Sequence, residues 1–381
     1  MAFGDRLMLK LFRRLEPGIN PDIEVGSALT EAGFEYTPAV GGWLAYRTRA
    51  DEPAALGLLQ AYAANEGDVW EYTLDQIADF YERAAAEESR PPEVAGPSLA
   101  DVLDAVHREP SELAEETIGA YLGVARLLGE RTAQLHQALA SVDDPAFAPE
   151  PFTALYQRSL YQTLRNQASS SFATLRQRQD LLPESVRPQA TAALGLSDQA
   201  MAQVRKLISS RSTAMRIRTH GDYHAGQVLW TGKDVVLIDF EGEPGRPLSE
   251  RRFKRSALTD IAGMLRSFHY AAYGTLLNPR LGGAVRPEDV GRLERWAAFW
   301  YLNVAAAFLG AYINEARGQP FVPADEVELR TTLELAMLQK VLYELSYELN
   351  NRPDWVSIPL RGLLDLFGRD AHEATTPSPA S

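Results

Sequence analysis

One stretch decides the fold of this chain: HGDYHAGQ at residues 220–227 and, a few residues later, VVLIDFEGEP at residues 235–244. Between them lie Val228-Leu229-Trp230 and the turn sequence Thr231-Gly232-Lys233-Asp234. Two short apolar, β-branched runs separated by a Gly-containing polar turn are typical of a β-hairpin. The sequence therefore predicts a loop, a strand, a tight turn and a second strand in one compact unit.

Folding that hairpin brings Asp222, Gln227 and Asp239 to the same end of it. Carboxylate and amide oxygens are the ligands that Mg²⁺ takes in nucleotide sites. Protein kinases use a similar order: His-Arg-Asp, four residues, Asn, and later Asp-Phe-Gly. By that pattern Asp222 is the catalytic base, and Gln227 and Asp239 are the metal ligands. The alternative is an ordinary polar hairpin in which both aspartates only satisfy turns.

The same residues resemble those of bacterial maltokinases, members of the aminoglycoside-phosphotransferase-like kinases. The resemblance rests on four segments, at residues 220–227, 239–244, 9–21 and 351–360. Gln227 stands where most antibiotic kinases of this family carry Asn. The resemblance implies ATP-dependent phosphorylation of maltose to maltose 1-phosphate, with ATP and Mg²⁺ as cofactors. It also makes trehalose synthase, to which such kinases are often fused, a candidate partner.

The implied fold class is α+β, a protein-kinase-like fold with an incomplete N-terminal sheet lobe and a larger, mainly helical C-terminal lobe. Residues 1–63 are expected to be a remnant of the sheet lobe with its hinge strand. Residues 64–370 are expected to form the catalytic and acceptor-binding lobe. Residues 371–381 have little apolar content and are expected to be a disordered tail. The resemblance further implies that strands and a phosphate-covering loop of the family are missing before Lys10.

The nucleotide site is expected in the first 63 residues. Lys10 lies in a predicted strand, and Pro21 opens a predicted helix that carries Glu24. The resemblance implies that Lys10 holds the nucleotide phosphates, that Glu24 supports it, and that Gln60 and Tyr62 present backbone groups to the base. A solvated edge-strand lysine and an ordinary strand end are the alternatives.

The acceptor is expected to bind along a long helix predicted from about residue 324 to 350. Polar side chains there recur at helical spacing and form a stripe suited to a sugar. The alternative is a salt-bridged surface stripe. The expected acceptor residues are Lys340, Glu344, Tyr347, Glu348 and Asn351 on this helix, with His224 and Glu241 from the motif.

Composition restricts the partners. The net charge of −13 argues against a nucleic-acid surface, and the absence of cysteine excludes disulfides and thiolate chemistry. The most apolar stretch, residues 297–313, is shorter than the ~20 residues of a membrane span and is interpreted as a core helix. No secretory signal is recognisable, so a cytoplasmic protein without membrane contact is expected. His136, beside another apolar helix face, is interpreted as structural.

Two other functions stay open from the sequence. The first is a kinase of the same fold that acts on another small acceptor, such as an aminoglycoside or choline. It is favoured if maltose is not an acceptor and the stripe on the long helix faces solvent. The second is a non-catalytic module that partners trehalose synthase, which the short sheet lobe favours.

Overall fold

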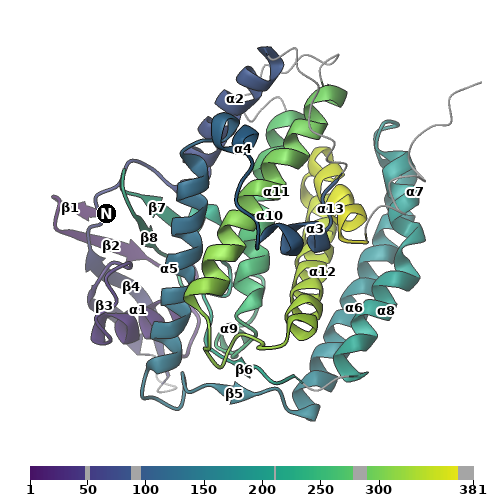
Figure 1. Ribbon diagram of the computed structural model, residues 1–381. Coiled ribbons are helices and arrows are strands. Elements are labelled where there is room, and N and C mark those ends of the chain that lie inside the picture. The colour runs from purple at the N-terminus through teal and green to yellow at the C-terminus, as the bar shows by residue number, and fades with distance from the viewer. Residues whose placement is uncertain (48–51, 87–95, 210–211, 278–289, 368–381) are drawn as a thin grey trace, which may run out of the picture.

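The structure is a computed structural model, and it describes residues 1–47, 52–86, 96–209, 212–277 and 290–367. A small sheet lobe lies at one end of the molecule, and a larger helical lobe fills the rest (Figure 1). This arrangement agrees with the expected α+β, kinase-like fold class. The tail expected to be disordered, residues 371–381, lies outside the described residues.

The small lobe is one antiparallel sheet with a helix packed beside it. The strand order is β1-β2-β4-β3, and the strands are β1 (Ala2–Phe3), β2 (Leu7–Leu11), β3 (Val40–Arg47) and β4 (Pro53–Ala61). Helix α1 (Pro21–Glu31) begins after Asn20, whose side chain accepts hydrogen bonds from the N–H groups of Asp22 and Ile23. Proline at the first helical position and this cap fix where α1 begins.

The large lobe is mainly helical. Its α-helices are α2 (Val69–Ala86), α3 (Leu99–Ala105), α4 (Glu112–Thr117), α5 (Tyr121–Ser141), α6 (Ala154–Arg178), α7 (Arg187–Gly195), α8 (Ser197–Ser209), α9 (Leu248–Arg251), α10 (Leu258–Leu277), α11 (Val290–Glu315), α12 (Glu326–Asn351) and α13 (Ser357–Phe367). Short 3₁₀ turns are η1 (Gln179–Leu181), η2 (Ala225–Gln227) and η5 (Pro353–Trp355). Two-stranded pairs are formed by β5 (Glu150–Pro151) with β6 (Met215–Arg216), and by β7 (Val228–Trp230) with β8 (Val235–Leu237).

Helix α11 runs through the core of the large lobe. It is long and apolar enough to cross a membrane, but 67% of its most apolar window is buried inside the protein. Trp296, Trp300 and Phe308 are almost completely buried. Helix α5 packs closely against it because Gly129 has no side chain: an added Cβ would overlap the Phe308 carbonyl oxygen. The predicted core helix is therefore confirmed.

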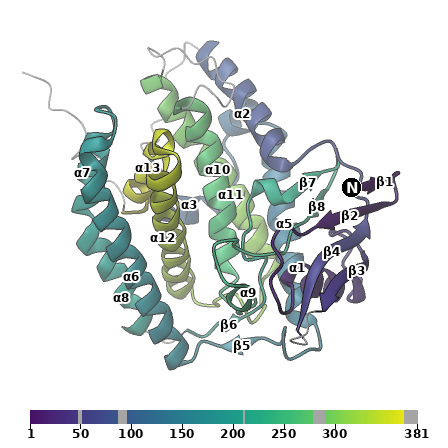
Figure 2. The ribbon, with the colours of Figure 1, turned by 180° about the vertical axis from the view of Figure 1, so that it is seen from behind.

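A second apolar cluster holds the outer helices to α12. It contains residues of α6, α7, α8, α12 and α13, among them Leu164, Val204, Leu338 and Leu345. Figure 2 shows α6, α7 and α8 along the edge of the large lobe that is farthest from the sheet. Helix α12 thus lies between these outer helices and the core.

The β7–β8 hairpin connects the two lobes. Leu237 N–H donates to the Tyr36 carbonyl at 2.8 Å, and Thr37 Oγ1 donates to the Leu237 carbonyl at 3.0 Å. Phe240 N–H donates to the Asp22 carboxylate at 2.8 Å. The hairpin follows residues 220–227 directly in sequence, so it connects this segment to the small lobe.

Candidate active site

A buried carboxylate holds the loop that carries Asp222. Asp260 on α10 is 2% exposed and accepts hydrogen bonds from His220 N–H at 2.7 Å and Gly221 N–H at 3.0 Å. His136 Nε2 lies 3.1 Å from the same carboxylate, and its Nδ1 lies 3.0 Å from the Tyr312 hydroxyl. Burial alone would raise the pKa of Asp260, but the hydrogen bond and charge of His136 lower it below its ordinary value.

Close contact between α10 and the loop depends on a glycine. A Cβ added to Gly263 would overlap the Tyr223 carbonyl oxygen. The Tyr223 ring is buried, and its hydroxyl lies 2.8 Å from Thr132 Oγ1 on α5. The residue after Asp222 is therefore held from two helices, which leaves the Asp222 side chain little freedom to move away.

Asp222 itself faces a small polar cavity. Its carboxylate lies 3.6 Å from Lys340 Nζ on α12. The cavity has a volume of about 80 Å³. Its lining includes acidic and basic side chains, among them the ion pair of Glu243 and Arg246 from the segment after β8. The other residues around it are Gln167, Gly221, Tyr223, Arg255, Thr259, Asp260, Gly263, Ala336, Gln339 and Tyr343.

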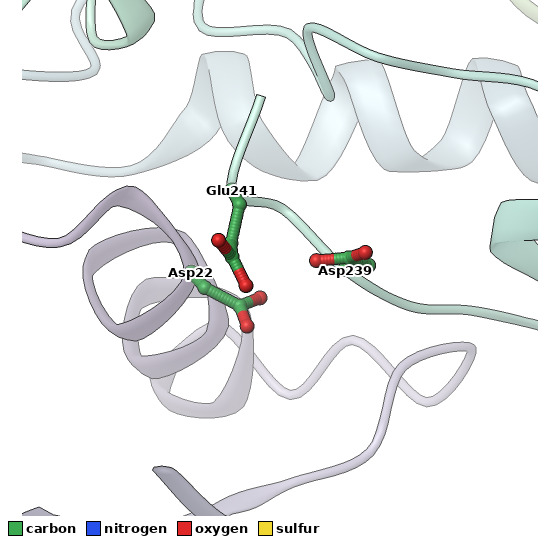
Figure 3. Close-up of side chains that lie close together, drawn as sticks. All are labelled: Asp22, Asp239 and Glu241. Atoms are coloured by element: carbon green, nitrogen blue, oxygen red, sulfur yellow. The ribbon is translucent and has the colours of Figure 1, made fainter. Parts of the chain in front are cut away.

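On the other side of the motif, three carboxylates surround one ammonium group. Lys10 Nζ lies 2.8 Å from Asp22, 2.6 Å from Asp239 and 2.6 Å from Glu241. Figure 3 shows the three carboxylates converging from α1 and from the segment after β8. Burial lowers the pKa of Lys10, but Asp22 and Asp239 more than reverse this, so the pKa is raised and Lys10 stays charged.

Asp239 adopts an unusual backbone conformation. Its φ is 67°, and among the described residues no other non-glycine residue has a positive φ. Such a conformation is strained for a residue with a side chain and is frequent at functional sites. Burial raises the pKa of Asp239, while Lys10 and a hydrogen bond with Gln227 lower it, and the net shift is downward. Ile238 N–H also donates to the Gln227 carbonyl at 3.0 Å, so the two predicted metal ligands, Asp239 and Gln227, lie side by side.

Glu24 does not support Lys10. Its carboxylate instead pairs with Arg218 at 2.9 Å and with Arg252. Asp22, two residues earlier on α1, occupies the expected position beside Lys10. Successive helical residues are about 100° apart, so residues i and i+2 face nearly opposite directions. This corrects the expectation for Glu24.

A cavity of about 500 Å³ lies beneath the sheet beside Lys10. It is within the ~300–1,000 Å³ of small-molecule sites. Gln60 and Tyr62 line it, as expected for the hinge, but the backbone N–H groups of Ala61 and Tyr62 already donate to carbonyls of Ala39 and Arg6. Tyr62 N–H is therefore not free to bind the base, which corrects the expectation for this group. The remaining lining is Met1, Met8, Leu9, Lys10, Leu11, Asp22, Pro38, Ala61, Ala63, Asn65, Leu229, Ile238 and Asp239.

Most of the expected acceptor stripe on α12 does not face the Asp222 cavity. Glu344 is buried and pairs with Arg266 of α10 at 2.8 Å. Glu348 is also buried and pairs with Arg352 at 2.7 Å. Tyr347 is exposed, and Asn351 donates to its carbonyl oxygen. Of the five residues, only Lys340 lines the cavity, so the expectation for the other four is corrected.

The two acceptor residues expected within the motif do not line the Asp222 cavity. His224 Nδ1 accepts a hydrogen bond from Gly226 N–H at 3.2 Å and so caps the 3₁₀ turn η2. Burial lowers the pKa of His224, which favours the neutral ring that this bond requires. Glu241 belongs to the carboxylate cluster around Lys10 rather than to the Asp222 cavity.

Sequence reasoning missed residues that the structure brings to the site. Asp22 was hidden because it looks like an ordinary acidic residue in the first turn of α1. Asp260 lies about forty residues after the motif, and only its place at the start of an apolar helix could have drawn attention to it. Glu243 and Tyr343 could have been identified from the sequence, because Glu243 lies inside the motif and Tyr343 lies one helical turn after Lys340.

Comparison with known proteins finds one sequence family whose model the motif region matches. Residues 58–242 match the model of the phosphotransferase enzyme family called APH. Glucosamine kinase of Mycolicibacterium smegmatis is 28% identical over 369 residues, which cover 95% of this chain and 76% of that protein. Glucosamine kinase of Streptacidiphilus jiangxiensis is 25% identical over 353 residues, which cover 92% of this chain and 66% of that protein.

Solved structures confirm the fold class. A glucosamine kinase in complex with glucosamine, ADP and inorganic phosphate superposes with a TM-score of 0.68 at 23% identity, over 96% of this chain and 77% of that one. Another crystal form of a glucosamine kinase gives a TM-score of 0.67 at 22% identity, over 96% and 74%. The chain therefore has the aminoglycoside-phosphotransferase-like kinase fold that the sequence predicts.

Proposed function

We propose that this protein transfers the γ-phosphoryl group of ATP to a hydroxyl of a small sugar, with glucosamine as the preferred acceptor. One observation carries the proposal. The two aspartates of the motif line different cavities, Asp239 the larger one beneath the sheet and Asp222 the smaller polar one. A kinase needs this division, because donor and acceptor must meet from opposite sides of the transferred group.

The nucleotide would lie beneath the sheet, with its base against the hinge. Ala63 N–H donates to no acceptor among the described residues, and it is free to bond to the base. Lys10 is charged and would neutralise the phosphates. Binding of the phosphates would draw the Lys10 ammonium away from its three carboxylate partners and leave those carboxylates available.

The carboxylates suit Mg²⁺. Oxygens of Asp22, Asp239 and Glu241 all lie within 4.8 Å of one another. Mg²⁺ binds oxygen at about 2.0–2.1 Å, so two ligands of one ion are at most about 4.2 Å apart, and small shifts would suffice. Asp239 would be the main ligand, with Gln227 beside it. Bound there, the ion would neutralise charge on the phosphates during transfer.

Asp222 would orient the acceptor hydroxyl and accept its proton. Lys340 Nζ lies 3.6 Å from this carboxylate, and Asp260 holds the loop in position. The cavity of about 80 Å³ is smaller than the ~300–1,000 Å³ of most small-molecule sites, so it must widen to admit an acceptor, and it must widen less for one sugar ring than for two. This size and the similarity to glucosamine kinases favour glucosamine. The motif resemblance to maltokinases supports maltose as the second acceptor to test.

The test is ADP formation by the full chain with Mg²⁺ and ATP, in the presence of glucosamine, maltose, kanamycin or choline. We expect glucosamine to give the highest kcat/KM. Asp222→Asn should lower kcat by roughly 10²–10⁴-fold, which is the usual contribution of a general base. Asp75→Asn, an exposed position on α2, is the matched control and should leave kcat unchanged.

Nucleotide binding, measured by calorimetry, separates the two halves of the proposal. Binding of Mg²⁺-ATP without turnover of any of the four acceptors would refute the acceptor class. No binding of Mg²⁺-ATP to the full chain would refute the kinase function itself.

A further inference from the structure

A second cavity adjoins the one at Asp222. It has a volume of about 460 Å³ and lies between α6, α8 and α12. The two cavities share three lining residues: Thr259, Ala336 and Gln339. Neither Asp222 nor any other residue of the catalytic loop lines the second cavity, so the proposed transfer does not require it.

Helices α6 and α12 each line both cavities, and each does so with a single continuous face. On α12 the residues at 328, 332, 335 and 339 line the second cavity, and those at 336, 339, 340 and 343 line the first. On α6 the residues at 157, 160 and 164 line the second, and residue 167 lines the first. Spacings of three and four residues keep a single helix face, so the two cavities form one trough that begins at Asp222.

The two ends of the trough differ in chemistry. The near end carries both acidic and basic side chains, such as Asp222 and Lys340. The far end is mainly apolar, with side chains of Phe152, Leu160, Leu164, Leu207, Val327 and Leu335. Its charged side chains already have partners. Glu328 accepts hydrogen bonds from Ser212 and Thr213 at 2.6–2.8 Å. Asp325 accepts one from Glu328 N–H at 2.9 Å, and Lys206 lies 3.7 Å from Glu334.

We propose that the far end binds an apolar substituent of the acceptor, so that the natural acceptor class includes sugars that carry an alkyl or aryl aglycone. This inference rests on the proposed function. With its reacting hydroxyl at Asp222, the sugar ring fills the near end, and a substituent on the opposite side of the ring points along α6 and α12. Because Glu328 is paired, a neutral aglycone is accommodated there better than a charged one.

The test compares two glycosides that differ only in the aglycone: methyl and phenyl β-glucosaminide. Their affinities for the full chain are measured by calorimetry, which does not depend on turnover. We expect phenyl β-glucosaminide to bind at least ~10-fold more tightly, since even one buried methylene is worth ~10–200-fold in selectivity. Thr332→Trp on α12 places a large side chain in the far end and should reduce this ratio to about one.

Two further variants keep the result interpretable. Thr163→Trp, at an exposed position of α6, is the matched control and should keep the full ratio. Leu160→Gln makes the far end polar without filling it, and should reduce the ratio if Thr332→Trp does not fold. Equal affinities of the two glycosides for the natural chain would overturn the inference while leaving the proposed function intact. Failure of both glycosides to bind would also overturn the inference, while turnover of free glucosamine tests the proposed function separately.

Discussion

Replacing Asp260 by Asn tests how the loop that carries Asp222 is held. In the natural chain both carboxylate oxygens accept hydrogen bonds, from the N–H groups of His220 and Gly221 and from the ring of His136. An asparagine keeps one acceptor oxygen and places an NH₂ group where the other stood. At least one buried donor of the loop would then face another donor.

The size of the effect follows from these contacts. A hydrogen bond to a charged group contributes about 1.5–3 kcal/mol, and leaving its buried partner unsatisfied costs about 1–3 kcal/mol more. We therefore expect Asp260→Asn to lower the free energy of unfolding by about 3–5 kcal/mol at neutral pH. Because the displaced backbone belongs to the residues before Asp222, kcat of the proposed reaction should also fall by at least ~10-fold.

The pH dependence gives a second readout. The pKa of Asp260 is lowered in the folded protein, so its stabilising effect is present above the unfolded value of about 3.9 and is lost as the pH falls through the folded value. The difference in unfolding free energy between the natural chain and Asp260→Asn should therefore shrink below pH 4.

Urea unfolding and steady-state kinetics together form the assay, and Asp365→Asn is the matched control. Asp365 is also buried beside a histidine, 3.2 Å from His269 Nε2, but it lies on α13 away from the loop. The control should lose stability and keep kcat. If Asp260→Asn kept kcat at a comparable loss of stability, the loop would not depend on this carboxylate, and the reasoning would be refuted.

Three further outcomes are expected. Gly263→Ala should push α10 and Tyr223 apart and lower kcat with little change in KM for ATP, since the nucleotide cavity is not lined by these residues; a rise in KM alone would contradict this. Lys10→Met should weaken ATP binding by roughly 10-fold or more in calorimetry, while binding of adenosine, which has no phosphates, stays the same. Glu344→Gln removes the negative partner of the buried Arg266, so it should lower the free energy of unfolding in urea by about 3–5 kcal/mol. KM for the sugar should not change, and a specific rise in that KM would show that Glu344 belongs to the acceptor site.

Much of the fold could be predicted because its signals are local. Asn20 and Pro21 mark the start of α1 in the sequence, and the structure shows the cap that they predict. The hairpin of β7 and β8 follows from two apolar runs and one turn. The spacing of the motif predicts that Asp222, Gln227 and Asp239 meet at the hairpin end. The structure brings Gln227 beside the segment of Asp239, through the bond from Ile238 N–H to the Gln227 carbonyl, while Asp222 lines a different cavity from Asp239.

The remaining site residues depend on how helices are rotated about their own axes, and local patterns do not contain that information. Asp22 and Glu24 are both acidic residues in the first turn of α1, and only packing against the sheet decides which one meets Lys10. Glu344 was expected in the acceptor stripe because it recurs at helical spacing with other polar residues of the long helix. It is buried because Arg266, 78 residues away in the chain, compensates its charge.

The hairpin contacts have a consequence for anyone who recombines this protein with its relatives. A crossover at residue 63 would look natural in the sequence, yet it would separate Tyr36 and Thr37 from Leu237, and Asp22 from Phe240. Chimeras that exchange residues 20–37 without 237–240 would join surfaces selected in different proteins. The smallest transferable unit is therefore discontinuous in the gene: α1 with the turn after it, together with β8 and the segment that follows.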